Sequence, residues 1–375
     1  MNFEDVDIDK IDVNKIDIDN CNVFSISLRD FFDKNKVKVF HGVAGRGKSS
    51  VINSVLMIFK ILFLWTTSTN KLKRDAQKRY NCRASTVCSA LFENKNGIFY
   101  GNFKYPDVDT IIIDEILQTN TKVFEWIRQN VGKYNIIVMT DKKQMLVVDE
   151  KSTGTAILRE FEEFLKEDFV LSDEGMETKR ARDAETKAKI EYLYQHSDES
   201  ATEFKADVDT NRFDIISYDD MIYDTNNIYI THKNETEEKL YLDMKFAMRQ
   251  WNEEELIPKG SLASRPPKDL SKYPVMSQSQ AERIKATRYC QVANVGSATR
   301  YQGSECRSDQ KLYYIITQGS RITNREWYTV VSRCWNLDSI VIVIAPNVTH
   351  KKLDNFAGKK IKESKILTVY TRGGA

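Results

Sequence analysis

Residues Gly42 to Ser49 read Gly-Val-Ala-Gly-Arg-Gly-Lys-Ser and satisfy the phosphate-binding pattern G-x-x-x-x-G-K-[ST]. Glycines permit a tight turn whose backbone N–H groups face phosphates, and the lysine adds positive charge. The pattern therefore predicts that Lys48 contacts the β- and γ-phosphates of a nucleotide and that the Ser49 hydroxyl binds Mg²⁺. The predicted nucleotide contacts in this loop are Gly42, Gly45, Gly47, Lys48, Ser49 and Ser50.

A second pattern, Ile-Ile-Ile-Asp-Glu, lies about 65 residues downstream and ends in Asp114 and Glu115. A buried strand that ends in two acids can place the first on Mg²⁺, through water, and the second on an attacking water molecule. Acids after an apolar strand are common, but their spacing from the phosphate-binding loop makes the pair informative. Together the two patterns indicate a nucleoside triphosphatase.

Polar residues further along the chain could complete such a site. Gln144 follows an apolar segment and could sense the γ-phosphate. Arginines occur at Arg180 and Arg182 and again at Arg333. An arginine from a second domain would stabilise the negative charge that develops during triphosphate hydrolysis.

The elements that must position these residues alternate between strand and helix. Short β-branched runs predict strands at 37–41, 64–67, 110–113 and 136–140, and again at 228–231, 311–317 and 339–345. Helices are expected at 50–63, 71–80 and 123–130. Alternation of this kind indicates parallel sheets flanked by helices, in two successive α/β units.

Composition excludes several classes of protein. The 375 residues are 41% hydrophobic and 29% charged with a net charge of +2, which argues against disorder and against coating of nucleic acid by bulk charge. No apolar run reaches about 18 residues, and no signal peptide is visible, so we expect a cytoplasmic protein with no membrane partner. The six cysteines form no C-x-x-C pair and are expected to be reduced thiols.

Charge and composition suggest the domain boundaries. Residues 1–20 hold seven acidic residues and two lysines, a net charge of −5, so the rest of the chain carries +7. We expect an acidic arm at 1–22, a first domain at 23–172 and a second at 173–375, with a proline-containing loop insertion at about 251–290.

The order of these motifs resembles the superfamily 1 helicases over about residues 37–345. Thr69-Asn70-Lys71 and the segment around Thr86 resemble the RecD-like and Dda-like branch, which moves 5′→3′ on single strands. The resemblance implies an α/β fold of two tandem RecA-like P-loop domains with ATP and Mg²⁺ in the cleft between them. It implies an enzyme that hydrolyses NTP to move along single-stranded DNA and unwind duplex.

The resemblance also assigns roles by position. It places Lys48, Glu115, Gln144, Arg180 and Arg333 in catalysis, Ser49 and Asp114 on the metal, and Gly303 and Glu305 at the nucleotide. Arg180 is favoured over Arg182 because it follows Thr178-Lys179 as the branch pattern does. The residues expected at the nucleic-acid strand are Thr69, Asn70, Lys71, Thr86, Thr299 and Tyr301, with Trp65, Tyr80, Tyr289 and Tyr301 as candidates for base stacking.

Departures from the family pattern keep alternatives open. Thr140 stands where motif III usually has glycine, and Val330 where motif VI often has alanine. These departures suggest a divergent enzyme of a viral or mobile genome, with replication proteins as partners. A viral superfamily 1 RNA helicase and a P-loop ATPase that does not unwind remain alternatives. Inserts near 92–105 and 251–290 are candidates for a duplex-splitting pin and a partial accessory domain.

Overall fold

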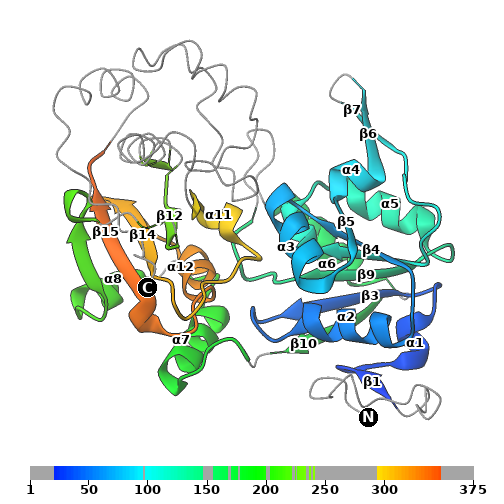
Figure 1. Cartoon of the computed structure of the whole chain (residues 1–375), viewed down its shortest axis with the longest axis horizontal. Coiled ribbons are helices and arrows are strands. Elements are labelled where there is room, and N and C mark those ends of the chain that lie inside the picture. The colour runs from blue at the N-terminus through cyan, green and yellow to red at the C-terminus, as the bar shows by residue number, and fades with distance from the viewer. Residues whose placement is uncertain are drawn as a thin grey trace, which may run out of the picture. The chain divides into compact units, whose positions relative to one another are not determined.

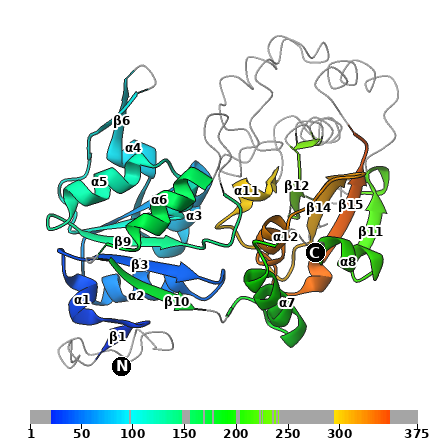
Figure 2. The ribbon, with the colours of Figure 1, turned by 180° about the vertical axis from the view of Figure 1, so that it is seen from behind.

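The computed structural model describes residues 21–95, 98–146, 155–167, 170–175, 178–199, 203–221, 226–233 and 294–347, together with Asp224, Thr236, Glu237 and Leu240. The chain divides into two compact units at Arg180/Ala181. The acidic arm over residues 1–20, Tyr289 and the insertion at 251–290 lie outside the described residues. Figures 1 and 2 show the elements of each unit from opposite sides.

The first unit is built on a six-stranded parallel sheet with the order β10-β3-β9-β8-β4-β5. Its strands are β3 (Val37–Gly42), β4 (Phe63–Thr67), β5 (Arg83–Thr86), β8 (Thr110–Asp114), β9 (Asn135–Thr140) and β10 (Val170–Gly175). Because all strands are parallel, their carboxyl ends meet at one edge. Strand β9 lies between β3 and β8, so the segments that follow these three strands are neighbours at that edge.

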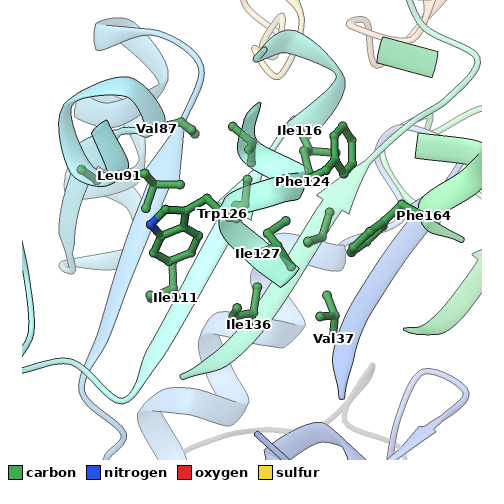
Figure 3. Packing of buried hydrophobic residues seen from close by; sticks show 14 of the residues in the cluster. Val37, Val87, Leu91, Ile111, Ile116, Phe124, Trp126, Ile127, Ile136 and Phe164 are labelled. Atoms are coloured by element: carbon green, nitrogen blue, oxygen red, sulfur yellow. The ribbon is translucent and has the colours of Figure 1, made fainter. Parts of the chain in front are cut away.

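Helices cover both faces of this sheet because successive strand residues point to opposite sides. One face packs Ile111 and Val138 against α4 (Val87–Leu91), α5 (Lys122–Asn130) and α6 (Thr155–Phe164), where Trp126, Ile127 and Phe164 fill the space (Figure 3). The other face carries Phe40, Trp65, Ile112, Ile137 and Met139 against α1 (Leu28–Phe32), α2 (Lys48–Ile58) and α3 (Asn70–Tyr80). Both faces of the central strands are apolar, which accounts for their uninterrupted hydrophobic runs.

The second unit has a five-stranded parallel sheet with the order β11-β15-β14-β12-β13. Its strands are β11 (Asp214–Ser217), β12 (Ile228–Thr231), β13 (Asn294–Ser297), β14 (Leu312–Thr317) and β15 (Ile340–Ala345). Its helices are α7 (Ala184–Gln195), α8 (Glu203–Asp209), α11 (Ala298–Tyr301) and α12 (Asn324–Val331). Trp327 of α12 packs edge-on against Phe204 and Phe213 and stacks on Tyr314.

Two elements differ from the sequence expectation. Residues 170–175 form strand β10, which pairs along the whole of β3 and belongs to the compact unit that ends at Arg180. Helix α2 begins at Lys48 and ends at Ile58 because Lys60 adopts a left-handed conformation with φ of 54° and β4 begins at Phe63. In both cases pairing with a neighbouring strand overrides the local pattern.

A short antiparallel hairpin lies within the segment that we expected to be a pin. Strand β6 (Phe92–Lys95) pairs with β7 (Ile98–Gly101), separately from the six-stranded sheet (Figure 1). Within the described part of the chain, no helix is both long and apolar enough to cross a membrane.

Candidate nucleotide-binding site

The phosphate-binding loop connects β3 to α2 at the carboxyl edge of the first sheet. Gly45 and Gly47 have φ of 80° and 96°, a left-handed backbone conformation that residues other than glycine adopt at a cost of about 1–2 kcal/mol. Gly47 is the N-cap of α2, so the unpaired N–H groups of the first helical turn and the helix dipole point into the loop. Lys48 Nζ donates to the carbonyl oxygens of Gly42 (3.0 Å) and Val43 (3.2 Å).

The two acids lie at the carboxyl end of β8, two strands away from β3: Asp114 is the last residue of the strand and Glu115 follows it. Burial raises the pKa of Asp114 to about 6, although a hydrogen bond from Trp65 Nε1 to Asp114 Oδ2 (3.1 Å) and the charge of Lys48 act in the opposite direction. Glu115 has φ of 55° and ψ of 53°, a left-handed conformation rare for a side chain of this size. Strain of about 1–3 kcal/mol at such a position is typical of functional sites.

The segment after β9 brings Asp141 and Gln144 to the same edge. Both side chains are buried, and Gln144 Nε2 donates to Asp141 Oδ2 at 3.0 Å. Burial lowers the pKa of Lys48, while the negative charges of Asp141, Glu115 and Asp114 act to raise it, in that order. Lys48 is thus electrostatically linked to acids from both neighbouring segments, and these groups form one site.

The structure separates the two arginines of the segment after β10. Lys179 N donates to Gly45 O at 3.0 Å, and a Cβ added to Gly45 would lie 2.6 Å from the Cβ of Arg180. The Arg182 guanidinium instead lies 3.9 Å from the ring centre of Trp335, and the backbone N–H of Arg182 donates to Trp335 O. Arg180 therefore lies at the phosphate-binding loop, whereas Arg182 is bound within the second unit.

The oxygen donors of this site suit a hard cation. Among the described residues no group of three or more His, Cys, Asp or Glu side chains could hold a metal. Mg²⁺ is usually bound by one or two carboxylates together with substrate phosphates and water, so it needs no such group. The Asp114 carboxylate and the Ser49 hydroxyl are donors of this kind.

The predicted strand-contacting residues of the first unit lie at the same carboxyl edge, after β4 and β5. Thr69 is the N-cap of α3 and accepts from Leu72 N, and Thr86 is the N-cap of α4 and accepts from Ser89 N. Asn70 and Lys71 form the first turn of α3. Each threonine hydroxyl keeps a proton that it can donate.

The second unit holds its predicted site residues in a separate network. Arg333 is buried and donates to Thr329 O, Ser304 O and Ser332 Oγ at 3.0 Å each. Glu305 Oε1 accepts from Trp335 Nε1 at 2.8 Å. Gly303 has φ of 77°, and Thr299 lies in α11.

Two candidates for base stacking are buried instead. Trp65 is fully buried on β4 and Tyr301 is 1% exposed, so neither ring presents a face to a base in this structure. Tyr80 is half-buried and stacks on Trp65, with ring centres 4.6 Å apart. Sequence reasoning missed that Trp65 contacts Asp114, because nothing in the sequence links residues on two different strands.

Comparison with known proteins establishes the fold. No family model matches the chain, and no curated protein sequence matches it. The structure of Bacteroides Pif1 bound to ssDNA superposes with a TM-score of 0.51 at 13% identity, covering 86% of this chain and 93% of that one. The Bacteroides Pif1 helicase in complex with ADP-AlF3 and ssDNA gives 0.52 at 14% identity, with coverages of 88% and 95%. Two parallel sheets match the two RecA-like domains of those structures, which confirms the expected α/β fold of two RecA-like units.

Proposed function

We propose that this chain is an ATP-dependent DNA helicase that hydrolyses nucleoside triphosphate to move along single-stranded DNA. The observation that carries the proposal is the convergence of Lys48, Asp114, Glu115, Gln144 and Arg180 on the carboxyl edge of one sheet. The Pif1 structures with the same fold were obtained with ssDNA, and one of them with ADP-AlF3. Their names support the choice of DNA and of an adenine nucleotide.

In this proposal the first unit binds and activates the triphosphate. Backbone N–H groups of the loop and the N-terminus of α2 bind phosphate oxygens. Lys48 exchanges its two carbonyl acceptors for phosphate oxygens. Ser49 and Asp114 would hold Mg²⁺, which when bound offsets the phosphate charge.

The proton of the attacking water goes to Glu115. Its carboxylate is largely buried, which strengthens its interaction with a nearby dipole because the local dielectric is low. Gln144, fixed by Asp141, orients the water or the γ-phosphate. Arg180 adds positive charge beside the loop, where negative charge accumulates in the transition state.

The second unit contributes Arg333, Gly303 and Glu305 in this proposal. The Arg333 guanidinium donates to two carbonyl oxygens and one hydroxyl in this structure. To act as an arginine finger, it would exchange these acceptors for phosphate oxygens. Glu305 would lie near the nucleotide, and the hydrogen bond from Trp335 Nε1 would hold the Glu305 carboxylate in place.

Strand binding is assigned to the threonine N-caps and the basic helix α3. Thr69, Asn70, Lys71 and Thr86 would contact phosphates in the first unit, and Thr299 in the second. Phosphate contacts give affinity without reading sequence, so we expect no target sequence and a strong dependence on salt. Replication or repair of a viral or mobile genome is the context that the divergent motifs favour.

The test is ATP turnover with single-stranded DNA or RNA, followed by unwinding of 5′-tailed and 3′-tailed duplexes. We expect DNA to stimulate turnover, the 5′-tailed duplex to be unwound faster, and Lys48→Ala to abolish both activities. Turnover in Lys48→Ala equal to that of the wild type would refute the catalytic assignment. Stimulation by RNA alone would identify an RNA helicase, and turnover without strand displacement a non-unwinding ATPase.

A further inference from the structure

Two stacked aromatic rings, Trp65 and Tyr80, lie next to Asp114, a proposed magnesium ligand. Trp65 is on β4 and Tyr80 is the last residue of α3, and their rings stack with an interplanar angle of 23°. The indole Nε1–H of Trp65 donates to Asp114 Oδ2 at 3.1 Å. The hydroxyl of Ser49, the other predicted metal ligand, donates to Met139 Sδ at 3.9 Å. The stack is therefore hydrogen-bonded to one predicted metal ligand, Asp114, through the indole of Trp65.

We propose that Trp65 is a positioning residue that orients Asp114 for Mg²⁺, and that Tyr80 holds the Trp65 ring in place by stacking on it. This inference rests on the proposed function, because that function assigns the metal to Asp114. The indole bond engages one carboxylate oxygen and restricts rotation of the Asp114 side chain.

Packing gives the stack the rigidity that such a role needs. Trp65 is fully buried in the core cluster that also contains Phe40, Ile112 and Met139, and Tyr80 packs against that cluster. A ring held on all sides has one orientation, so its hydrogen bond has one direction. Partners of metal ligands commonly affect metal affinity by 10–100-fold although they never touch the metal.

The stack also connects Asp114 to the proposed strand-binding helix. Helix α3 begins at Asn70, beside the Thr69 cap, and ends at Tyr80. A displacement of α3 along its axis would therefore be transmitted to the Tyr80 ring and from there to Trp65 and Asp114.

A core-filling role for Trp65 makes a different prediction from a positioning role. Phenylalanine would still fill most of the volume and stack on Tyr80, but it has no N–H to donate to Asp114. Trp65→Phe thus removes the hydrogen bond to Asp114 and keeps a ring, whereas Tyr80→Phe keeps both the stacked ring and the Trp65–Asp114 hydrogen bond. Trp327→Phe is the matched control, because Trp327 Nε1 donates to the Asp207 carboxylate (2.7 Å) inside the second unit.

The experiment is titration of ADP binding by fluorescence at a series of Mg²⁺ concentrations, with and without chelator. The half-effect concentration is the Mg²⁺ concentration that produces half of the full Mg²⁺-dependent change in ADP affinity. For Trp65→Phe we expect this concentration to rise about 10-fold and the affinity for ADP without Mg²⁺ to be unchanged. We expect Tyr80→Phe, which keeps the stacked ring, and Trp327→Phe to leave this Mg²⁺ concentration unchanged.

A half-effect concentration within twofold of the wild type in folded Trp65→Phe protein would overturn the proposal. If Trp65→Phe does not fold, Tyr80→Leu, which removes the half-buried ring stacked on the indole, should raise the half-effect concentration, and an unchanged value would overturn the proposal. Failure of the wild type to bind ADP, or binding unaffected by Lys48→Ala, would instead contradict the proposed function.

Discussion

Replacing Gly45 by alanine tests whether the phosphate-binding loop and the segment after β10 are packed as one unit. A Cβ at Gly45 would lie 2.6 Å from the Cβ of Arg180 and 2.8 Å from Oγ1 of Thr178. The first of these atoms is attached directly to the backbone, so relieving the overlap requires movement of the main chain.

Gly132→Ala is the matched control in the same unit. Gly132 has φ of 83°, close to the 80° of Gly45, so the cost of a left-handed alanine is shared at about 1–2 kcal/mol. The nearest atom to a Cβ at Gly132 is Asn35 Oδ1 at 3.4 Å, the end of a side chain. Gly45→Ala should therefore lose about 1–3 kcal/mol more than Gly132→Ala, the usual cost of overpacking.

Urea denaturation followed by circular dichroism gives the free energy of unfolding of the two variants and the wild type, and ADP binding gives the state of the site. We expect weaker ADP binding only in Gly45→Ala, because the displaced backbone carries Arg180. Equal losses of stability in the two variants, with equal affinity for ADP, would refute the packing argument.

Two further predictions concern the arginines and a buried lysine. Arg180→Ala should lower the turnover number for ATP. Arg182→Ala should instead cost about 0.5–2 kcal/mol of stability through the lost contact with Trp335 and leave turnover per folded molecule unchanged. The reverse pattern in steady-state kinetics would exchange the roles of the two arginines. Lys38 is fully buried, and burial lowers its pKa to about 7 from an ordinary value of 10.5. Between pH 7 and 10.5 the unfolded chain therefore binds more protons at Lys38 than the folded protein does, so the free energy of unfolding should rise with pH in that window. Subtracting the free energy of unfolding of Lys38→Met at each pH isolates this contribution, and a flat difference would contradict it.

Several parts of the fold follow directly from local sequence. The strand at 37–42 and the helix after it are specified by an apolar run, a glycine turn and a segment without proline or glycine. The strands at 110–114 and 135–140 have apolar middles, Ile111 to Ile113 and Ile136 to Met139, because both of their faces are buried. Strand β10 was missed because residues 170–175 contain polar residues, and only pairing with β3 makes them a strand.

For the site, the sequence determined the chemistry of the phosphate-binding loop and of the two acids, since glycine spacing and an acid pair after a strand are local signals. The tertiary structure decided everything that depends on neighbouring strands. It placed Arg180 at Gly45 and Arg182 on Trp335, although only one residue separates them in the chain. It also turned Trp65 from an expected base-stacking residue into a buried partner of Asp114. The physical reason is that side-chain orientation across a sheet depends on which strands pair and in which register, and that information lies in contacts distant along the sequence.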